Sequence, residues 1–217
     1  MKPLSTILHG TFRFRTKHLK LASSPNMGEI KEFLETVPGM ISVESCILHM
    51  VICSTQVVRG DVIEIGAWQG RNSIALALGC KESANGKLTV IDHFKGNPGK
   101  ERFYRISKKD LSDVFDGFLS NIARSGLTNE VRTFAGSREE FDKKLAVRLL
   151  FIDGNHDYEA VKADIAHFYP MLVPGAIVIL DDYSEEFPGV IRAAAEFMKE
   201  NEYATSIILG RSLVIKT

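Results

Sequence analysis

The sequence predicts an α/β protein with a doubly wound, mostly parallel sheet of about seven strands, a C-terminal antiparallel strand pair and an N-terminal helical extension. Three observations carry this prediction. Short apolar runs alternate with helical patterns along the chain. Two of these runs, at residues 149–152 and 176–180, flank a helical pattern and stop at aspartates, as in a β-α-β unit. The last two runs are separated only by Gly210-Arg211, which predicts a tight turn between antiparallel strands.

The composition is typical of one globular domain over residues 1–217, with residues 1–58 as the helical extension and residues 59–217 as the core. The 27 basic side chains balance the 27 acidic ones, so the chain has no net field to attract nucleic acid or an anionic membrane. Neither a signal peptide nor a membrane span is expected. Three cysteines without a CxxC pair indicate packed thiols in a reducing compartment, and a cytoplasmic location is therefore expected.

The N-terminal extension has two expected helices. Residues 1–28 are mixed and partly basic, and they are either a solvated segment or a contact for a phosphate or a partner. A short helix is expected at 28–37. A longer one follows Ser42, which is a good N-cap residue. Cys46 and Cys53 fall on one face of this longer helix, and we expect both to be packed.

The first core strand is expected at 61–65, and it runs into a glycine turn before a helix at 74–78. This arrangement favours a nucleotide-type site, because glycine lets the backbone approach a ligand at a helix N-terminus. The spacing is G-x-x-x-G, from Gly66 to Gly70, and a tight turn alone also explains both glycines. The absence of G-x-G-x-x-G argues against a standard NAD or FAD site. Glu64, at the end of a buried strand, needs a polar partner.

The second core strand, expected at 88–91, ends at Asp92-His93. An acidic residue about 20 positions beyond the glycine turn is placed to bond ribose hydroxyls. No clear helix follows, which weakens the alternative that Asp92 is only a helix cap. The polar residues 94–105 instead predict a long loop beside the ligand edge, either a lid or a passive excursion.

The remaining elements follow in order. An amphipathic helix is expected at 109–125 and a third strand at 131–134. Ser137 then either reaches an adenine or caps a helix at 138–145. The later elements are a strand at 148–153, a helix at 159–172, a strand at 176–180, a helix at 190–200 preceded by Pro188, and strands at 203–209 and 212–215.

Polar side chains follow two of the predicted parallel strands. Asp153 ends one strand, Asp181 and Asp182 end the next, and His156 lies one turn beyond Asp153. Because carboxyl ends of parallel strands meet at the edge where α/β sheets bind ligands, we expect these four side chains to lie together. Together they can bind a hard cation and move a proton. For each aspartate alone, the alternative is an N-cap of the following helix.

The order of elements resembles the Rossmann-like fold of class I S-adenosylmethionine-dependent methyltransferases over about residues 36–217. The resemblance is carried by residues 62–70, by Asp92, and by residues 172–176 before the late strand. It implies that S-adenosylmethionine is the cofactor. The residues expected at the cofactor site are Glu64, Gly66, Ala67, Trp68, Gly70, Asp92, His93, Ser137 and Asp153.

Residues 151–164 resemble more narrowly the macrocin/mycinamicin-type sugar O-methyltransferases and the cephalosporin-hydroxylase-like group. In the sugar enzymes, aspartates at the positions of Asp153, Asp181 and Asp182 hold magnesium, and a histidine at the position of His156 is the proposed base. The resemblance therefore implies Mg²⁺ as a second cofactor and His156 as the catalytic residue.

The function implied is divalent-metal-assisted O-methylation of a hydroxyl on a small molecule, such as a sugar or natural product. A cation would lower the pKa of the acceptor oxygen, and His156 would accept its proton. Two alternatives stay open: a metal-independent methyltransferase acting on nitrogen or a carboxylate, and a non-catalytic cofactor-binding module. The expected partner is a small-molecule acceptor, with no nucleic acid and no membrane, and a homo-oligomer is compatible with the sequence.

Overall fold

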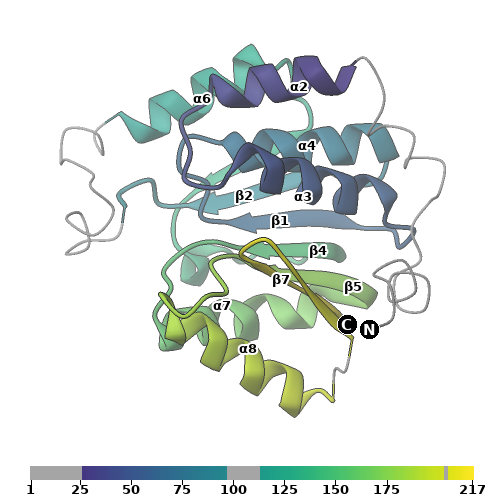
Figure 1. The fold of residues 1–217 in the computed structure, drawn as a ribbon, viewed down its shortest axis with the longest axis vertical. Helices are drawn as coiled ribbons and strands as arrows, with labels where there is room; N and C mark the ends of the chain where they lie inside the picture. Colours follow the sequence, from purple (N-terminus) through teal and green to yellow (C-terminus); the bar gives the residue numbers. More distant parts are fainter. Residues whose placement is uncertain (1–25, 97–112, 203–204) are drawn as a thin grey trace.

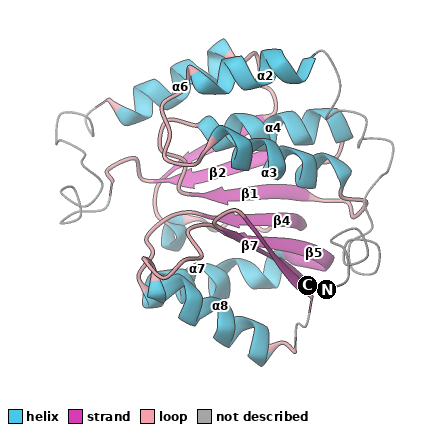
Figure 2. Ribbon diagram, viewed as in Figure 1, coloured by secondary structure: helices cyan, strands magenta, loops and turns pink. Residues whose placement is uncertain are grey.

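The computed structural model describes residues 26–96, 113–202 and 205–217, which form a seven-stranded sheet with helices on both faces (Figures 1 and 2). The strand order is β3-β2-β1-β4-β5-β7-β6; the strands from β3 to β5 pair in parallel, and β7 runs antiparallel to both β5 and β6. The predicted fold class is therefore confirmed. The strands are β1 Asp61–Ile65, β2 Leu88–Asp92, β3 Val131–Ala135, β4 Val147–Ile152, β5 Leu172–Leu180, β6 Ser206–Leu209 and β7 Ser212–Lys216.

Helices of the described residues form a layer on each face of the sheet (Figure 1). Ser42 caps α3 by accepting a hydrogen bond from the backbone N–H of Ser45, as predicted. One layer contains α2 (Asn26–Glu35), α3 (Val43–Thr55), α4 (Arg71–Ser83) and α6 (Val114–Arg124), and the other contains α7 (Tyr158–Phe168) and α8 (Pro188–Glu200). None of these helices is long and apolar enough to cross a membrane.

The parallel register brings the carboxyl ends of β1, β2, β4 and β5 to one edge of the sheet. Ile65, the last residue of β1, pairs with Ile91 on one side and with Ile152 on the other. The hydrogen-bond ladder continues one residue beyond the strands, because Asp153 N–H donates to Ile65 and Asp181 N–H donates to Ile152. The aspartates that end the strands therefore lie side by side along this edge.

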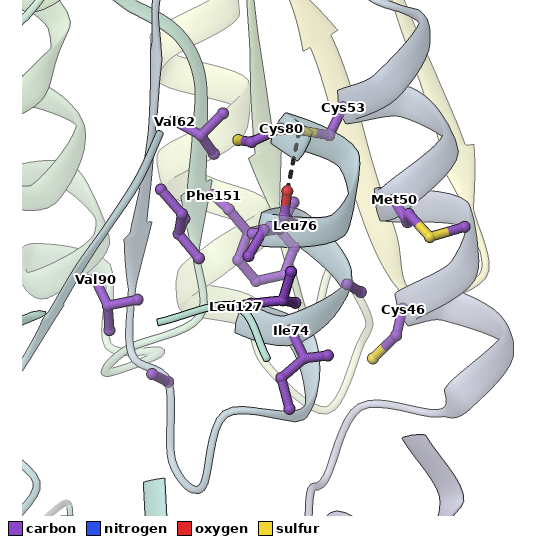
Figure 3. Packing of buried hydrophobic residues seen from close by; sticks show 14 of the residues in the cluster. Cys46, Met50, Cys53, Val62, Ile74, Leu76, Cys80, Val90, Leu127 and Phe151 are labelled. Carbon is purple, nitrogen blue, oxygen red and sulfur yellow. Dashed lines mark hydrogen bonds between the residues drawn. The ribbon is translucent and has the colours of Figure 1, made fainter. Parts of the chain in front are cut away.

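The core is divided by the sheet into two apolar clusters. On the α3 and α4 side, Cys46 and Cys53 are both buried, as predicted (Figure 3). Cys53 also faces a thiol of α4, with its Sγ 3.8 Å from Cys80 Sγ, and it donates to the Leu76 carbonyl. A Cβ added at Gly79 would lie 2.7 Å from Cys53 Cβ, so a glycine lets the two helices approach this closely.

A guanidinium group is buried under the opposite end of the sheet. Arg148, on β4, is fully buried. Its nitrogens donate to the backbone carbonyls of Gly60, Asn85 and Cys53 at 2.7–3.1 Å and to the Gln56 side chain at 3.1 Å. One side chain thus satisfies acceptors from the end of α3 and from the turns before β1 and β2.

Two helices end earlier than predicted, one because of Pro170 and the other because of Phe141. The helix expected at 159–172 ends at Phe168, because Pro170 lacks a backbone N–H and only a 3₁₀ turn, η3 (Tyr169–Met171), follows. The residues after it already belong to β5. The helix expected at 138–145 is only the 3₁₀ turn η2 (Arg138–Glu140), because Phe141 is extended and packs into the core.

Other boundaries also differ from expectation. The helix expected at 74–78 begins at Arg71 and continues to Ser83. The predictions for residues 1–28, for the loop at 94–105 and for the start of the helix at 109–125 fall wholly or partly outside the described residues.

We expect Arg148→Leu to lower the free energy of unfolding by about 3 kcal/mol or more, because several buried carbonyls lose their donor at once. The measurement is urea unfolding followed by far-UV circular dichroism. Arg132→Leu is the matched control, since Arg132 is 49% exposed and pairs with Asp61 at the surface. It should cost less than about 1 kcal/mol. Equal losses in the two variants would contradict this account of Arg148.

Candidate functional site

A cavity of about 950 Å³ opens at the carboxyl edge of the sheet. Its walls come from the turn after β1, the ends of β2, β3, β4 and β5, the segment before α3, and the β6–β7 turn. Such an edge is the usual ligand site of open α/β sheets. The predicted site residues that line it are Gly66, Ala67, Trp68, Asp92, His93, Ser137, Asp153, His156, Asp181 and Asp182.

The turn after β1 has a backbone that only glycine can adopt at its first position. Gly66 has a φ of +80°, and a Cβ there would lie 2.1 Å from the Asp153 carbonyl oxygen. Asp92 holds the rest of the turn, since its Oδ2 accepts hydrogen bonds from the N–H groups of Ala67 at 2.7 Å and Trp68 at 3.2 Å. The carboxylate predicted to bind ribose thus also fixes the wall beside it.

Glu64 and Gly70 are the predicted cofactor residues that do not line this cavity. Glu64 is fully buried behind the turn, where Asn72 and Ser73 of α4 donate hydrogen bonds to its two oxygens. Burial raises the pKa of Glu64 to about 8, and these hydrogen bonds act in the opposite direction. Gly70 is the left-handed N-cap residue of α4. Direct cofactor contacts of both residues stay predictions, and their positions favour supporting roles.

The acidic residues expected after β4 and β5 gather around an imidazole. One ligand atom each from Asp153, His156 and Asp182 lie within 4.8 Å of one another. His156 Nε2 is 3.4 Å from Asp153 Oδ1 and 3.5 Å from Asp182 Oδ2. The edge of the ring packs on Phe187, with centroids 4.5 Å apart. Asp182 adopts a left-handed φ of +54°, a strained conformation for a residue other than glycine.

Asp181 lines the same cavity but lies deeper than its neighbour. Its Oδ1 accepts a hydrogen bond from the Ser212 hydroxyl at 2.5 Å. Burial, together with the charge of Asp182, raises the pKa of Asp181 to about 6. Burial raises the pKa of Asp153 well above its ordinary value, and the charges of Asp181 and Asp182 add to this effect. The sequence analysis names Asp153, Asp181 and Asp182 as metal ligands. In the structure, the three residues whose ligand atoms lie closest together are Asp153, His156 and Asp182.

One cation of the cavity was missed by sequence reasoning. Arg211, in the β6–β7 turn, lies with Nη2 2.9 Å from Asp182 Oδ1 and 2.9 Å from Glu186 Oε2. We interpreted Arg211 only as a turn residue. Because β7 returns antiparallel beside β5, the turn before it reaches the same edge, and that topology is the signal that could have found it.

The sequence leaves two roles open for Ser137, a helix cap and an adenine contact, and the structure bears on the first. It forms a capping box with Glu140 at η2, so the capping role is confirmed for a shorter helix than expected. It also lines the cavity, where its contact with an adenine stays a prediction. His93 is exposed at the cavity rim.

Comparison with known proteins places these residues in a family. Residues 63–183, more than half of the chain, match the model of a family described as a methyltransferase domain. The 8-demethyl-8-(2,3-dimethoxy-alpha-L-rhamnosyl)-tetracenomycin-C 4'-O-methyltransferase of Streptomyces olivaceus is 28% identical over 141 residues, which are 58% of this chain and 54% of that protein. The chain therefore spans about half the length of this curated relative.

Solved structures share the fold. An O-methyltransferase from Bacillus cereus in complex with SAH is similar with a TM-score of 0.63 at 18% identity, over 93% of this chain and 96% of that chain. The O-methyltransferase NovP is similar with a TM-score of 0.61 at 19% identity, over 88% of this chain and 78% of that chain.

The raised pKa of Asp153 predicts a pH dependence of stability. An acid with a raised pKa in the folded state binds more protons there than in the unfolded chain, from about pH 4 upward. The free energy of unfolding should therefore fall as pH rises through this window. Asp153→Asn removes the effect, and it should raise the free energy of unfolding at pH 8, with chelator present, by about 1–2 kcal/mol more than at pH 4.

The measurement is urea unfolding of the wild type and the variant at both pH values. Asp142→Asn changes an exposed aspartate outside the cavity and is the control. A gain for Asp153→Asn that is the same at pH 4 and pH 8 would contradict the raised pKa of Asp153.

Proposed function

The chain belongs to the methyltransferase domain family, and we propose that it transfers the methyl group of S-adenosylmethionine to a hydroxyl oxygen of a small molecule, assisted by a divalent cation. The observation that carries the proposal is the grouping of Asp153, His156 and Asp182 within 4.8 Å in a cavity that the glycine turn and Asp92 also line. One cavity therefore holds the features expected for a cofactor site and for an acceptor site.

The donor set fits a divalent cation. Asp153 and Asp182 supply carboxylate oxygens, which Mg²⁺ and Mn²⁺ prefer, and an imidazole beside them is compatible with Mn²⁺. Burial, and after it the charges of Asp181 and Asp182, raise the pKa of Asp153, and a bound cation would counter both effects. Asp153, Asp182 and, from its deeper position, Asp181 are the proposed ligands. When bound, the cation would lower the pKa of the acceptor hydroxyl.

The cofactor side is assigned to the β1 and β2 ends. Asp92 already accepts two backbone N–H groups on Oδ2 and one on Oδ1, which fixes the carboxylate and leaves one lone pair, on Oδ1, for a ribose hydroxyl. The backbone of Gly66, Ala67 and Trp68 would line the methionine end, and Ser137, which also lines the cavity, is the proposed adenine contact. The sulfonium carries an activated methyl group, so the protein's task is to align it with the acceptor and exclude water.

His156 is the proposed base. Oxygens of Asp153 and Asp182 lie 3.4 Å and 3.5 Å from its Nε2, and the Phe187 ring packs against the imidazole. Carboxylates next to an imidazole stabilise the cationic form that results when the ring accepts a proton from the acceptor hydroxyl.

The acceptor is proposed to be a hydroxylated small molecule. A volume of about 950 Å³ is at the upper end of small-molecule sites, enough for a cofactor and a second ligand. Met40, Ile41 and Phe187 give the wall apolar surface next to the charged cluster. The curated relative is named for a 4'-O-methylation of a rhamnosyl-bearing compound, which supports a sugar or natural-product hydroxyl here.

A metal-independent methyltransferase is the second candidate, and Arg211 is the observation that favours it. Its guanidinium lies 2.9 Å from Asp182 and already compensates part of the charge that a metal ion would compensate. In that case turnover would be unchanged in excess chelator.

We expect Asp182→Ala to lower the affinity for Mn²⁺ by about tenfold or more, because one of the closest ligand atoms is lost. S-adenosylhomocysteine affinity should stay within about threefold of the wild type, because Asp182 lies on the other side of the cavity. Titration calorimetry with each ligand checks both values. Glu185→Ala, which removes an exposed carboxylate that does not line the cavity, is the control and should bind Mn²⁺ as the wild type does.

Undiminished Mn²⁺ binding by Asp182→Ala would remove the metal site from the proposal. The same titration on His156→Ala separates two roles: retained Mn²⁺ affinity with lost methyl transfer supports the base, whereas lost affinity would make the imidazole a ligand instead.

Asp92→Ala should weaken S-adenosylhomocysteine binding by about tenfold or more, because the ribose partner is lost and the turn at Ala67 and Trp68 loses its acceptor. Calorimetry at pH 7.5 measures it. Asp116→Ala, an exposed aspartate on α6, is the control. Wild-type affinity in Asp92→Ala would place the cofactor elsewhere.

A further inference from the structure

A buried chain of hydrogen bonds runs through α3 and joins the two sides of the candidate site. Its centre is His49, which is 1% exposed and lies outside every sequence motif. His49 Nδ1 is 2.8 Å from Asn72 Oδ1 on α4, and Nε2 is 3.1 Å from Ser212 Oγ on β7. Burial lowers the pKa of His49 to about 4. The ring is thus a neutral bridge between two elements that are remote in sequence.

Each end of this chain reaches a carboxylate. Asn72 Nδ2 donates to Glu64 Oε1 at 2.9 Å, behind the glycine turn. Ser212 Oγ donates to Asp181 Oδ1 at 2.5 Å, in the acidic cluster. All five side chains are buried, so water does not replace these contacts when one of them is lost.

We infer that His49 is a positioning residue of the proposed reaction, which holds Asp181 at the cation side and, through Asn72, Glu64 at the cofactor side. The inference rests on the proposed function, because that function assigns Asp181 to the cation side and Glu64 to the cofactor side. It adds a residue of the N-terminal helical extension to a site otherwise built from the core.

The cation side needs such a tether. Asp181 faces the negative charges of Asp153 and Asp182, which favour its turning away from them. The Ser212 hydroxyl holds one oxygen, and His49 in turn holds Ser212. Groups that orient metal ligands through a hydrogen bond commonly change metal affinity by about 10–100-fold when removed.

The ring itself has little freedom to move. Its plane is tilted by 58° against Phe151, with centroids 4.8 Å apart. Phe151 is on β4, two residues before Asp153. His49 is therefore fixed by the strand that carries one of the proposed ligands, and it can fix Ser212 and Asn72 in turn.

The cofactor side depends on the start of α4. Asn72 and Ser73 are in its first turn, and both bond Glu64. Because the helix starts directly after Gly70, the Asn72 position and the glycine turn are linked through a few residues of backbone. Loss of the His49 side chain should therefore affect the position of the glycine turn less than it affects the position of Asp181.

The test measures binding by the whole chain, with Mn²⁺ and S-adenosylhomocysteine as separate probes in titration calorimetry. His49→Leu should weaken Mn²⁺ binding by about tenfold and S-adenosylhomocysteine binding by about threefold. Ser212→Ala should weaken only Mn²⁺ binding. His49→Gln should restore Mn²⁺ affinity to within about threefold of the wild type, because its amide offers a donor and an acceptor.

Cys53→Ala is the control for general destabilisation. Cys53 is buried on the same helix one turn beyond His49, but it takes no part in the chain of hydrogen bonds. It should lower Tm while both Kd values stay at the wild-type level.

The outcomes separate the inference from the function on which it rests. A wild type that binds neither probe overturns both. A wild type that binds both, with a folded His49→Leu variant of equal affinity, overturns the role of His49 alone. If His49→Leu does not fold, Ser212→Ala decides: weaker Mn²⁺ binding supports the inference, and wild-type binding overturns it.

Discussion

Repulsion between carboxylates at the carboxyl edge of the sheet is the constraint on which the rest of the site depends. A parallel sheet places the residues after β4 and β5 side by side, so Asp153, Asp181 and Asp182 cannot separate without breaking the ladder that supports them. A guanidinium from the β6–β7 turn compensates part of this charge, the Ser212 hydroxyl donates a hydrogen bond to Asp181, and an imidazole after β4 lies 3.5 Å from Asp182. The acidic edge is therefore supported by the whole C-terminal half of the core.

In the cavity wall, side chains of the proposed site also accept hydrogen bonds from backbone N–H groups. Asp92 orients the turn after β1 and begins the chain's exit from β2, since its two oxygens accept N–H groups from both segments. Among the described residues, three of the five non-glycine residues with positive φ line this cavity: Trp68, Phe94 and Asp182. Strained backbone persists only where surrounding contacts determine it, and here those contacts surround the proposed site.

The strands and the aspartates at their ends could be predicted from the sequence, because apolar runs and their spacing are properties of neighbouring residues. Two such runs with a helical pattern between them also predict that the two strands are parallel. The convergence of Asp153, His156 and Asp182 followed from that topology. The family resemblance implies that Glu64 faces the cofactor, whereas its place at the end of a buried strand predicts only that it needs a polar partner. In the structure Asn72 and Ser73 of α4 are that partner. Arg148, His49 and Arg211 have partners 23 or more positions away in the chain, and nothing in the local sequence indicates such contacts.

The chain of side chains from Glu64 to Asp181 has a consequence for where hydrogen atoms reside. Its four bonds need four hydrogens, and whichever way the groups are oriented, the Asn72 amide, a neutral His49 ring and the Ser212 hydroxyl contribute one each. Burial of the imidazole disfavours its cationic form. With Asn72 donating to Glu64 and Ser212 donating to Asp181, the contact between a neutral His49 and Ser212 therefore lacks a hydrogen, unless one of the two carboxyl groups is protonated and the hydrogen bond at its end reverses. A positive ion beside Asp181 would favour the arrangement in which that hydrogen belongs to Glu64. Binding of a cation beside Asp181 would then change the protonation of Glu64, which lies buried behind the glycine turn.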